Sequence, residues 1–198
     1  MKRFQADGEA YWSKWSIFAG RCRFNNMPNF TIRPASVEDI PIIRKMAEIV
    51  FRETYAGILS PGQMEYMMDW MYSEDSLRKQ IEAPCKAFHI AYCGNVPAGY
   101  VSFEADGKAA DGRGRFHLQK LYALPEYQHS GLGRQMFEYV KALLHEWNPD
   151  GCRIELNVNR ENPAVGFYEH IGMTRDRKGD FPIGKGFYMN DYIYVLDF

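Results

Sequence analysis

The segment that most constrains the fold is residues 121–134, with the sequence LYALPEYQHSGLGR. An apolar run that ends at Pro125 predicts a buried strand, and Gly131 and Gly133 open a segment that continues to about Trp147. Apolar side chains recur along that segment at helical spacing, namely Leu132, Met136, Val140, Leu143 and Trp147. A strand, a short loop with two glycines and a long amphipathic helix in this order predict a layered α/β domain.

The loop before this helix has the chemistry of a phosphate-binding cradle. The first turn of a helix leaves backbone N–H groups without partners, and its dipole adds partial positive charge there. Glycines let a phosphate approach that backbone closely, and His129 and Arg134 supply further donors. The alternative is a tight turn that needs its glycines for conformation alone. Two other phosphate motifs are excluded, because Met136 stands where a dinucleotide fingerprint needs glycine and no G-x-x-x-x-G-K-[ST] loop is present.

Strand-like and helix-like segments alternate along the rest of the chain. We predict strands over Phe30–Arg33, Ala87–Cys93, Val96–Glu104, Arg115–Leu124, Cys152–Val158 and Phe187–Phe198. Three helices are predicted to begin at the capping residues Ser36, Ser60 and Ser73, and another covers Pro163–Ile171. Gly94-Asn95 predicts a hairpin turn, and Gly179–Gly186 is predicted to be a loop. This order of elements predicts a mixed α/β sheet.

Composition restricts the classes of function. The 198 residues, 46% of them hydrophobic, suffice for one domain with a sizeable core. Lys and Arg total 24 against 25 Asp and Glu, which argues against a broad basic surface for nucleic acid. The four cysteines form no C-x-x-C pair, so we expect no structural zinc site and a reducing cytoplasm as the location. The longest uncharged run, Ala87–Phe103, contains glycine and proline and predicts no membrane helix.

Residues 1–27 are predicted to be an N-terminal extension, followed by a single domain over residues 28–198. The extension carries five basic residues and two acidic ones, whereas Met27 precedes a segment, PNFTIRPASVEDI, that is typical of the beginning of a domain. The extension is either native or the result of an upstream start codon.

Two motifs resemble those of the GNAT N-acetyltransferase superfamily. Gln128–Gly133 fits the [QR]-x-x-G-x-[GA] loop of that family, and the preceding LYALP is similar to its L-x-V-x-P, with Ala123 in place of Val. Downstream, NRENPAVGFYEHIGM resembles the second motif, although Asn162 lies six residues before Tyr168, where seven is common. The resemblance covers roughly Phe30–Phe198. It implies an α/β fold with a central, mostly antiparallel sheet of about seven strands flanked by helices.

The same resemblance implies a direct transfer from acetyl-CoA, as cosubstrate, to an amine, with no metal. The cosubstrate would lie where the strand that ends at Ala123 parts from Cys152–Val158. The residues implied to hold it are Leu121, Tyr122, Ala123, Gln128, His129, Ser130, Gly131, Leu132, Gly133, Arg134 and Asn162. Tyr168 is implied to protonate the departing sulfur, the alternative being a core ring with a satisfied hydroxyl. The general base stays open between Glu104, His117, Glu155 and a chain of waters.

Residues 51–82 resemble the acceptor-side helices of bacterial PaiA-type polyamine N-acetyltransferases. They carry six acidic and three basic side chains, which favours a small cationic acceptor amine such as a polyamine. Glu53 and Asp69 are the acidic residues we single out for a role in acceptor binding. The alternatives are a merely solvated acidic face, a protein N-terminus or an aminoglycoside as acceptor, and a CoA-binding regulator without activity. Either a monomer or a homodimer is compatible with the resemblance.

Overall fold

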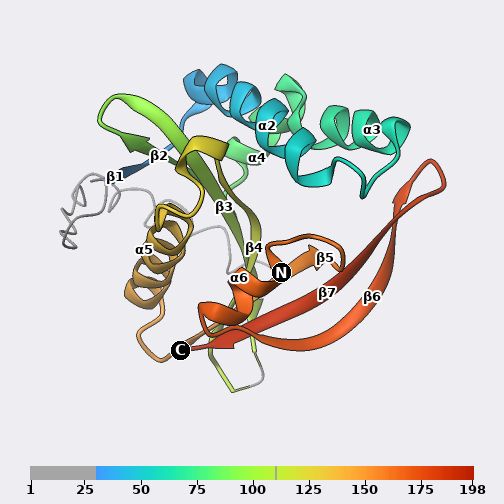
Figure 1. The fold of residues 1–198 in the computed structure, drawn as a ribbon. Coiled ribbons are helices and arrows are strands. Elements are labelled where there is room, and N and C mark those ends of the chain that lie inside the picture. Colours follow the sequence, from blue (N-terminus) through green and yellow to red (C-terminus); the bar gives the residue numbers. More distant parts are fainter. Residues whose placement is uncertain (1–29, 110) are drawn as a thin grey trace.

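The computed structural model describes residues 30–109 and 111–198, and in this part of the chain seven strands form one sheet (Figure 1). The strands are β1 (Phe30–Pro34), β2 (Lys86–Cys93), β3 (Val96–Lys108), β4 (Gly114–Ala123), β5 (Cys152–Asn159), β6 (Thr174–Gly184) and β7 (Phe187–Asp197). Their order in the sheet is β1-β2-β3-β4-β5-β7-β6. Only β4 and β5 pair in parallel, so the predicted mixed, mostly antiparallel sheet of about seven strands is confirmed.

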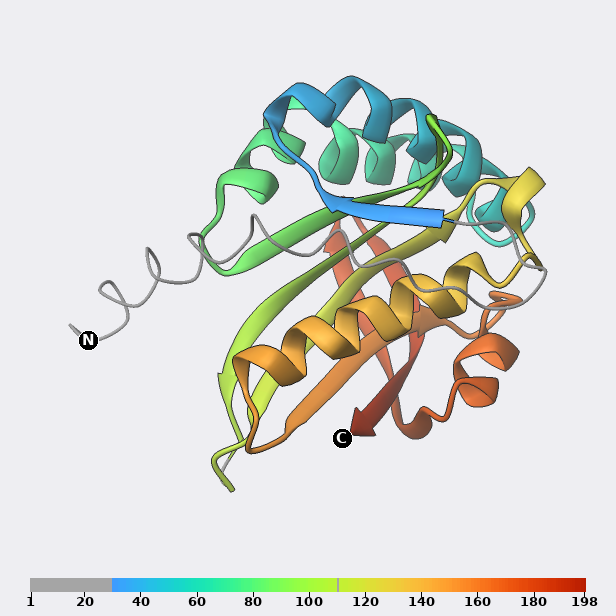
Figure 2. The same ribbon diagram turned by 90° about the vertical axis from the view of Figure 1, so that its left-hand side faces the viewer.

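Helices cover both faces of this sheet. The described helices are α2 (Ile40–Tyr55), α3 (Pro61–Tyr72), α4 (Glu74–Glu82), α5 (Leu132–Trp147) and α6 (Val165–His170). Figures 1 and 2 show α2, α3 and α4 over one face and α5 lying along the other. Each layer has its own core: Phe137 of α5 packs with Ile154, and Ile43 of α2 packs with Ile90. Burying one such side chain contributes roughly 1.5–3 kcal/mol.

Local capping signals fix where the helices begin. The Ser36 backbone N–H donates to Asp39 at 2.9 Å, within a capping box that precedes α2. The Ser60 hydroxyl accepts from the backbone N–H of Gln63 at 3.2 Å, one residue before α3. The predicted starts at Ser36, Ser60 and Ser73 are therefore confirmed to within a few residues, and so is the hairpin turn at Gly94-Asn95.

One element was missed by the sequence patterns. The predicted loop over Gly179–Gly186 is wrong, because β6 continues to Gly184 and only Lys185 and Gly186 form the turn into β7. The strand β6 is the edge of the sheet, and most of its residues are exposed. It therefore lacks the apolar alternation by which a half-buried strand is recognised, and its backbone is held by pairing with β7. The predicted extension over residues 1–27 lies outside the described residues.

The strands β4 and β5 pair over only four residues each, and this positions the site. Their register runs from Gly114–Cys152 to His117–Glu155, and past these two positions the described residues show no pairing between them. A bulge in β4 at Gln119 also shifts its register against β3. As a result the two strands part just before the segment predicted to hold the cosubstrate.

Within residues 30–109 and 111–198, no helix has both the length and the apolarity needed to cross a membrane. The same residues contain no group of three His, Cys, Asp or Glu side chains that could hold a metal ion.

Candidate active site

The loop between β4 and α5 has the backbone geometry of the predicted cradle. Gly131 caps α5 with a φ of +86°, a left-handed conformation that favours glycine. Its carbonyl accepts from the backbone N–H of Gln135 at 3.0 Å, which leaves the N–H groups of the first turn without partners within the helix. A Cβ atom at Gly133 would lie 3.3 Å from the Phe167 ring. Gly133 thus also permits the close approach of α5 to α6.

Side chains of this loop are held by short local bonds. Ser130 Oγ donates to the Tyr127 carbonyl at 2.6 Å, and Gln128 Nε2 donates to the Ala123 carbonyl at 3.4 Å. His129 adopts a positive φ of 58°, and its side chain and that of Arg134 are exposed. The loop therefore presents a helix N-terminus flanked by two exposed nitrogen-bearing side chains.

The end of β4 borders the gap that opens between β4 and β5. Leu121, Tyr122 and Ala123 pair on their other side with β3, where a Cβ at Gly99 would meet the Tyr122 carbonyl at 2.5 Å. Leu121 packs against the α5 layer of the core, whereas Tyr122 packs against the α2 layer. The backbone of this segment is free on the β5 side to pair with a ligand that lies like an added strand.

Tyr168 lies on α6 and is 8% exposed. Its ring contacts those of Phe167 and Tyr194, with centroid separations of 5.3 and 6.2 Å. Burial, with a smaller contribution from Tyr55, raises the pKa of Tyr168 well above its usual value. The hydroxyl therefore keeps its proton at neutral pH and can act as a proton donor.

Tyr55, the last residue of α2, lies close to Tyr168. It is buried, and burial raises its pKa, while hydrogen bonds with the side chains of Tyr122 and Asn162 oppose that rise. The predicted cosubstrate residue Asn162 also accepts from the Ala164 N–H at 2.8 Å, at the start of α6. Residues from α2, β4 and the loop before α6 thus meet beside Tyr168.

Asp191 of β7 lies in the same region, and sequence patterns did not indicate it. It is 6% exposed and pairs in register with Asn159 of β5. Its Oδ2 accepts from Asn157 Nδ2 at 3.3 Å, whereas its buried Oδ1 has no hydrogen-bond partner among the described residues. Burial raises the pKa of this carboxyl group, and the same carboxylate also contributes to the raised pKa of Tyr55.

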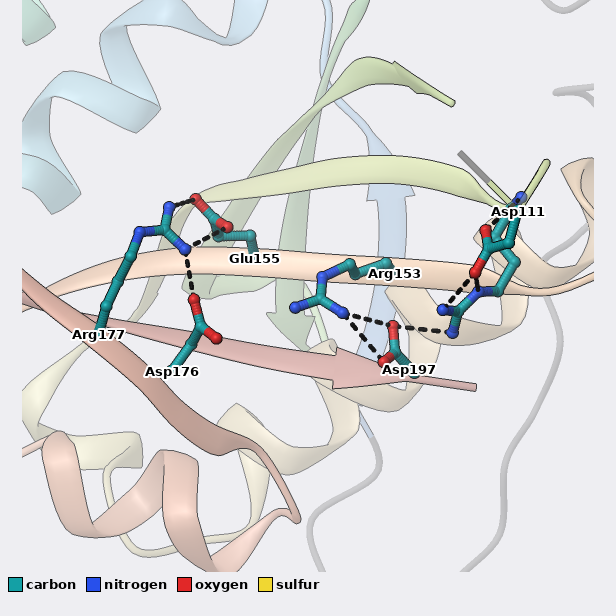
Figure 3. A network of polar contacts seen from close by, with 7 residues as sticks. Asp111, Arg153, Glu155, Asp176, Arg177 and Asp197 are labelled. Carbon is teal, nitrogen blue, oxygen red and sulfur yellow. Dashed lines mark hydrogen bonds and ion pairs between the residues drawn. The ribbon is translucent and has the colours of Figure 1, made fainter. Parts of the chain in front are cut away.

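The candidate general bases named from the sequence lie at the paired end of β4 and β5. Glu104 is bound by Lys86 at 2.8 Å and by Gln119 Nε2 at 2.6 Å. Figure 3 shows Glu155 held by both terminal nitrogens of Arg177, at 2.9 and 3.3 Å. Burial lowers the pKa of His117. Both Glu104 and Glu155 therefore form ion pairs. Among the three candidate bases, His117 forms no ion pair in the described part of the chain.

A surface pocket of about 370 Å³ lies between α3 and the turn that joins β6 to β7. It is lined by Gly62, Glu65, Tyr66, Asp69, Lys185 and Phe187. The hairpin is docked onto α3, because the Tyr66 hydroxyl donates to the Ile183 carbonyl at 2.7 Å. In Figure 1 the tip of this hairpin reaches the level of α3. Asp69, singled out above for acceptor binding, lines this pocket, whereas Glu53 is exposed on α2 and does not line it.

Comparisons with known proteins agree with this geometry. The family model described as an acetyltransferase (GNAT) domain matches residues 55–182. The spermidine N(1)-acetyltransferase of Thermoplasma acidophilum is 28% identical over 162 residues, which are 78% of this chain and 95% of that protein. An N-acetyltransferase of Lactobacillus delbrueckii subsp. lactis, described as uncharacterized, is 27% identical over 161 residues, 80% of this chain and 92% of that protein.

Solved structures share the fold. The PaiA N-acetyltransferase of Thermoplasma acidophilum, solved in complex with coenzyme A, superposes with a TM-score of 0.70 at 22% identity and covers 86% of this chain and 99% of that chain. The ribosomal-protein-S18-alanine N-acetyltransferase of Escherichia coli gives a TM-score of 0.61 at 17% identity, with 85% and 93% covered. The matched family model, the strands that part and the capped loop after β4 lead to one conclusion: this chain is a member of the GNAT acetyltransferase family, with acetyl-CoA as its cosubstrate.

Proposed function

We propose that this protein acetylates a primary amine of a small cationic molecule, with a polyamine as the first candidate. The observation that carries the proposal is the pocket between α3 and the β6–β7 turn, where Glu65 and Asp69 stand beside the rings of Tyr66 and Phe187. Carboxylates that line a hollow attract cations, and aromatic faces pack well against both methylene groups and ammonium groups. The similarity to a spermidine N(1)-acetyltransferase supports the same acceptor class.

Lys185 also lines the pocket, where it limits the attraction for cations. Its Nζ lies 5.1 Å from the centre of the Tyr66 ring. Two carboxylates against one ammonium leave a net negative charge. This balance favours an acceptor that carries one or two positive charges in the pocket over an anionic one.

On the cosubstrate side, the residues that border the gap between β4 and β5 hold acetyl-CoA. The backbone of Leu121 and Ala123 binds the thioester arm of acetyl-CoA, and the N–H groups after Gly131 bind its pyrophosphate. The acceptor nitrogen attacks the thioester carbonyl directly, so no covalent acyl-enzyme is formed. Tyr168 then gives its proton to the departing sulfur. A free phenol has a pKa of about 10 and a thiol about 8.5, and burial raises the pKa of Tyr168 further. The transfer is therefore uphill and depends on the sheltered site, which also disfavours the charged thiolate.

We also propose a cytoplasmic location. The described cysteines Cys85, Cys93 and Cys152 are free thiols, which is typical of a reducing compartment.

The test is the release of free thiol from acetyl-CoA with a panel of acceptors. The panel holds spermidine, a diamine, an aminoglycoside, a peptide with a free N-terminus and a neutral amino acid. We expect the highest kcat/KM with spermidine or the diamine, falling as salt is added because charges are screened. Preference for the amino acid or the peptide would overturn the polyamine assignment. If no thiol is released with any of these acceptors, a CoA-binding regulator without activity is favoured.

A further inference from the structure

One face of β7 leads from the surface pocket towards the buried tyrosines, and its side chains follow a path from Phe187 through Met189 to Asp191. Phe187 contacts Tyr66 of α3, with ring centroids 5.7 Å apart, and Met189 Sδ lies 3.8 Å from Gln63 Nε2. Asp191 is the next residue on this face, because side chains alternate along a strand. The path from Phe187 to Asp191 is four residues, or about 13 Å of strand.

Asp191 ends this path with an oxygen that the protein leaves unsatisfied. Its Oδ1 is the one buried carboxylate oxygen without a hydrogen-bond partner in the described part of the chain. A buried polar atom without a partner is costly, so its retention calls for a use. Arg160, the cation whose charge acts on Asp191, donates through one terminal nitrogen to Asp180 at 2.7 Å and to the Gly179 carbonyl at 2.9 Å. Its buried Nε, like Asp191 Oδ1, has no hydrogen-bond partner in the described part of the chain.

We propose that Asp191 receives the ammonium group of the acceptor and takes the proton that its nitrogen must lose before it attacks the thioester. This rests on the proposed function, since it needs an amine acceptor and acetyl-CoA. Glu65 and Asp69 in the pocket, at the other end of this face, attract the cationic acceptor towards the site. Asp191 would be the group that was missing among the bases named from the sequence.

The proton balance of the reaction closes with two residues. The ammonium gives one proton to the Asp191 carboxylate, and the neutral nitrogen forms the new C–N bond with the acetyl carbon. The C–S bond breaks, and Tyr168 gives its proton to the sulfur. The nitrogen loses a second proton as the amide forms, and this proton restores Tyr168. Asp191 returns its own proton to solvent, so each turnover produces one amide, one thiol and one free proton.

The surroundings of Asp191 make its carboxylate a stronger base than that of an exposed aspartate. Burial raises its pKa, and the charge of Asp180 adds to the rise, whereas the Asn157 hydrogen bond and the charge of Arg160 oppose it. From α2, the Tyr55 hydroxyl faces it, and this phenol stays neutral because burial raises its own pKa. A carboxyl group that acts as a base must be ionised, and it is protonated at low pH. In the pH profile, kcat/KM should therefore fall on the acid side, as pH drops through the raised pKa of Asp191.

The principal test is Asp191→Asn, with Asp197→Asn as a matched control. Asp197 lies on the same strand, and its carboxylate is exposed and paired with Arg153 and Arg113. With a cationic acceptor we expect Asp191→Asn to lower kcat/KM by about 100-fold or more, the scale of a lost general base, with acetyl-CoA affinity unchanged. The control should stay near the wild-type value. An Asp191→Asn enzyme with wild-type kcat/KM would overturn the proposal.

A weakly basic acceptor separates a catalytic role from a structural one. The nitrogen of 2,2,2-trifluoroethylamine is neutral at pH 7, because the fluorines withdraw electrons, and it needs no base before attack. The deficit of Asp191→Asn should therefore shrink at least about tenfold with this amine. An equal deficit with both acceptors would show that Asp191 only supports the fold.

Asn157→Ala provides a measurement that does not depend on the folding of Asp191→Asn. Asn157 is exposed, and its loss removes the hydrogen bond to Asp191 Oδ2, which raises the pKa of that carboxyl further. The acid limb should move to higher pH in this variant, and an unmoved limb would overturn the proposal. If the wild-type enzyme acetylates no amine, the proposed function itself is wrong. If it acetylates amines but none of these changes has an effect, only the role of Asp191 is wrong.

Discussion

At the scale of single residues, burial decides what the site can do chemically. Tyr168 and Asp191 are each more than nine-tenths buried, one on α6 and one on β7. Burial raises the pKa of both, so the phenol keeps its proton and the carboxyl becomes a stronger base. The proposed direct acyl transfer uses two groups with opposite tasks, a proton donor and a base.

Tyr168→Phe tests the donor. We expect kcat at saturating substrates to fall about 10- to 1000-fold, because the departing sulfur loses its proton source, with acetyl-CoA affinity nearly unchanged. Tyr194→Phe is the control, since its ring also packs against Tyr168 and its hydroxyl instead donates to Glu169 at 2.7 Å. A wild-type kcat for Tyr168→Phe would leave this residue as packing only.

At the scale of elements, the junctions between strands and helices position the groups to which we assign binding roles. The loop before α5 is shaped by a left-handed Gly131, and α6 is held close to α5 because Gly133 has no side chain to meet Phe167. On the other side of the sheet, the hairpin of β6 and β7 closes the pocket against α3. The helix starts and the hairpin turn at Gly94 could be predicted, because each depends on residues only a few positions apart in the sequence. The docking of the β6–β7 hairpin onto α3 could not be predicted in this way, because it joins Tyr66 to Ile183, which lie far apart in the sequence.

Gly131→Glu should raise the KM for acetyl-CoA by about tenfold or more, because a carboxylate would occupy and repel the phosphate position. Gly172→Ala is the control for the strain that any side chain causes at a positive φ. Gly172 has a φ of +93° and open space around it. That variant should lose some stability and keep its KM. Equal KM values in the two folded variants would contradict the cradle.

Neutralising the pocket on α3 should weaken acceptor binding alone. We expect the double change Glu65→Gln and Asp69→Asn to raise the KM for spermidine about three- to thirtyfold, with the largest effect at low salt. Glu53→Gln removes an exposed acidic residue outside the pocket and should have little effect. The KM for spermidine is measured by steady-state kinetics at a low and a high salt concentration. An equal rise in KM for Glu53→Gln would indicate that general surface charge, and not the pocket, attracts the acceptor.

At the scale of the whole molecule, two buried bases make stability depend on pH. Burial lowers the pKa of His89 to about 3 and that of Lys120 to about 7. Lys120 Nζ donates to Gln80 Oε1 at 2.8 Å and lies over the rings of Tyr72 and Phe88. The unfolded chain binds more protons than the folded one between pH 7 and 10.5 at Lys120, and between pH 3 and 6.5 at His89. The free energy of unfolding therefore rises with pH through both windows.

Lys120→Met should stabilise the protein by roughly 1–3 kcal/mol near pH 6, where the folded lysine must carry its charge in an apolar place. The gain should shrink towards pH 10, because the folded wild-type lysine is then neutral and the unfolded one is losing its proton. Lys141→Met is the control, as that lysine pairs with Glu138 on the surface. Urea unfolding at both pH values measures the difference. A gain of equal size at the two pH values would contradict the buried charge.

Short-range patterns in the sequence were enough to predict the helix starts at Ser36 and Ser60, the helix that follows Gly131 and membership in the GNAT family. These features depend on residues within one or two turns of each other, where capping and backbone conformation decide the structure. The exposed strand β6 and the closeness of Asp191 to Tyr55 were decided by tertiary structure alone. An edge strand has no periodic pattern, and an aspartate in a strand shows its burial only when the sheet order brings α2 and β7 together.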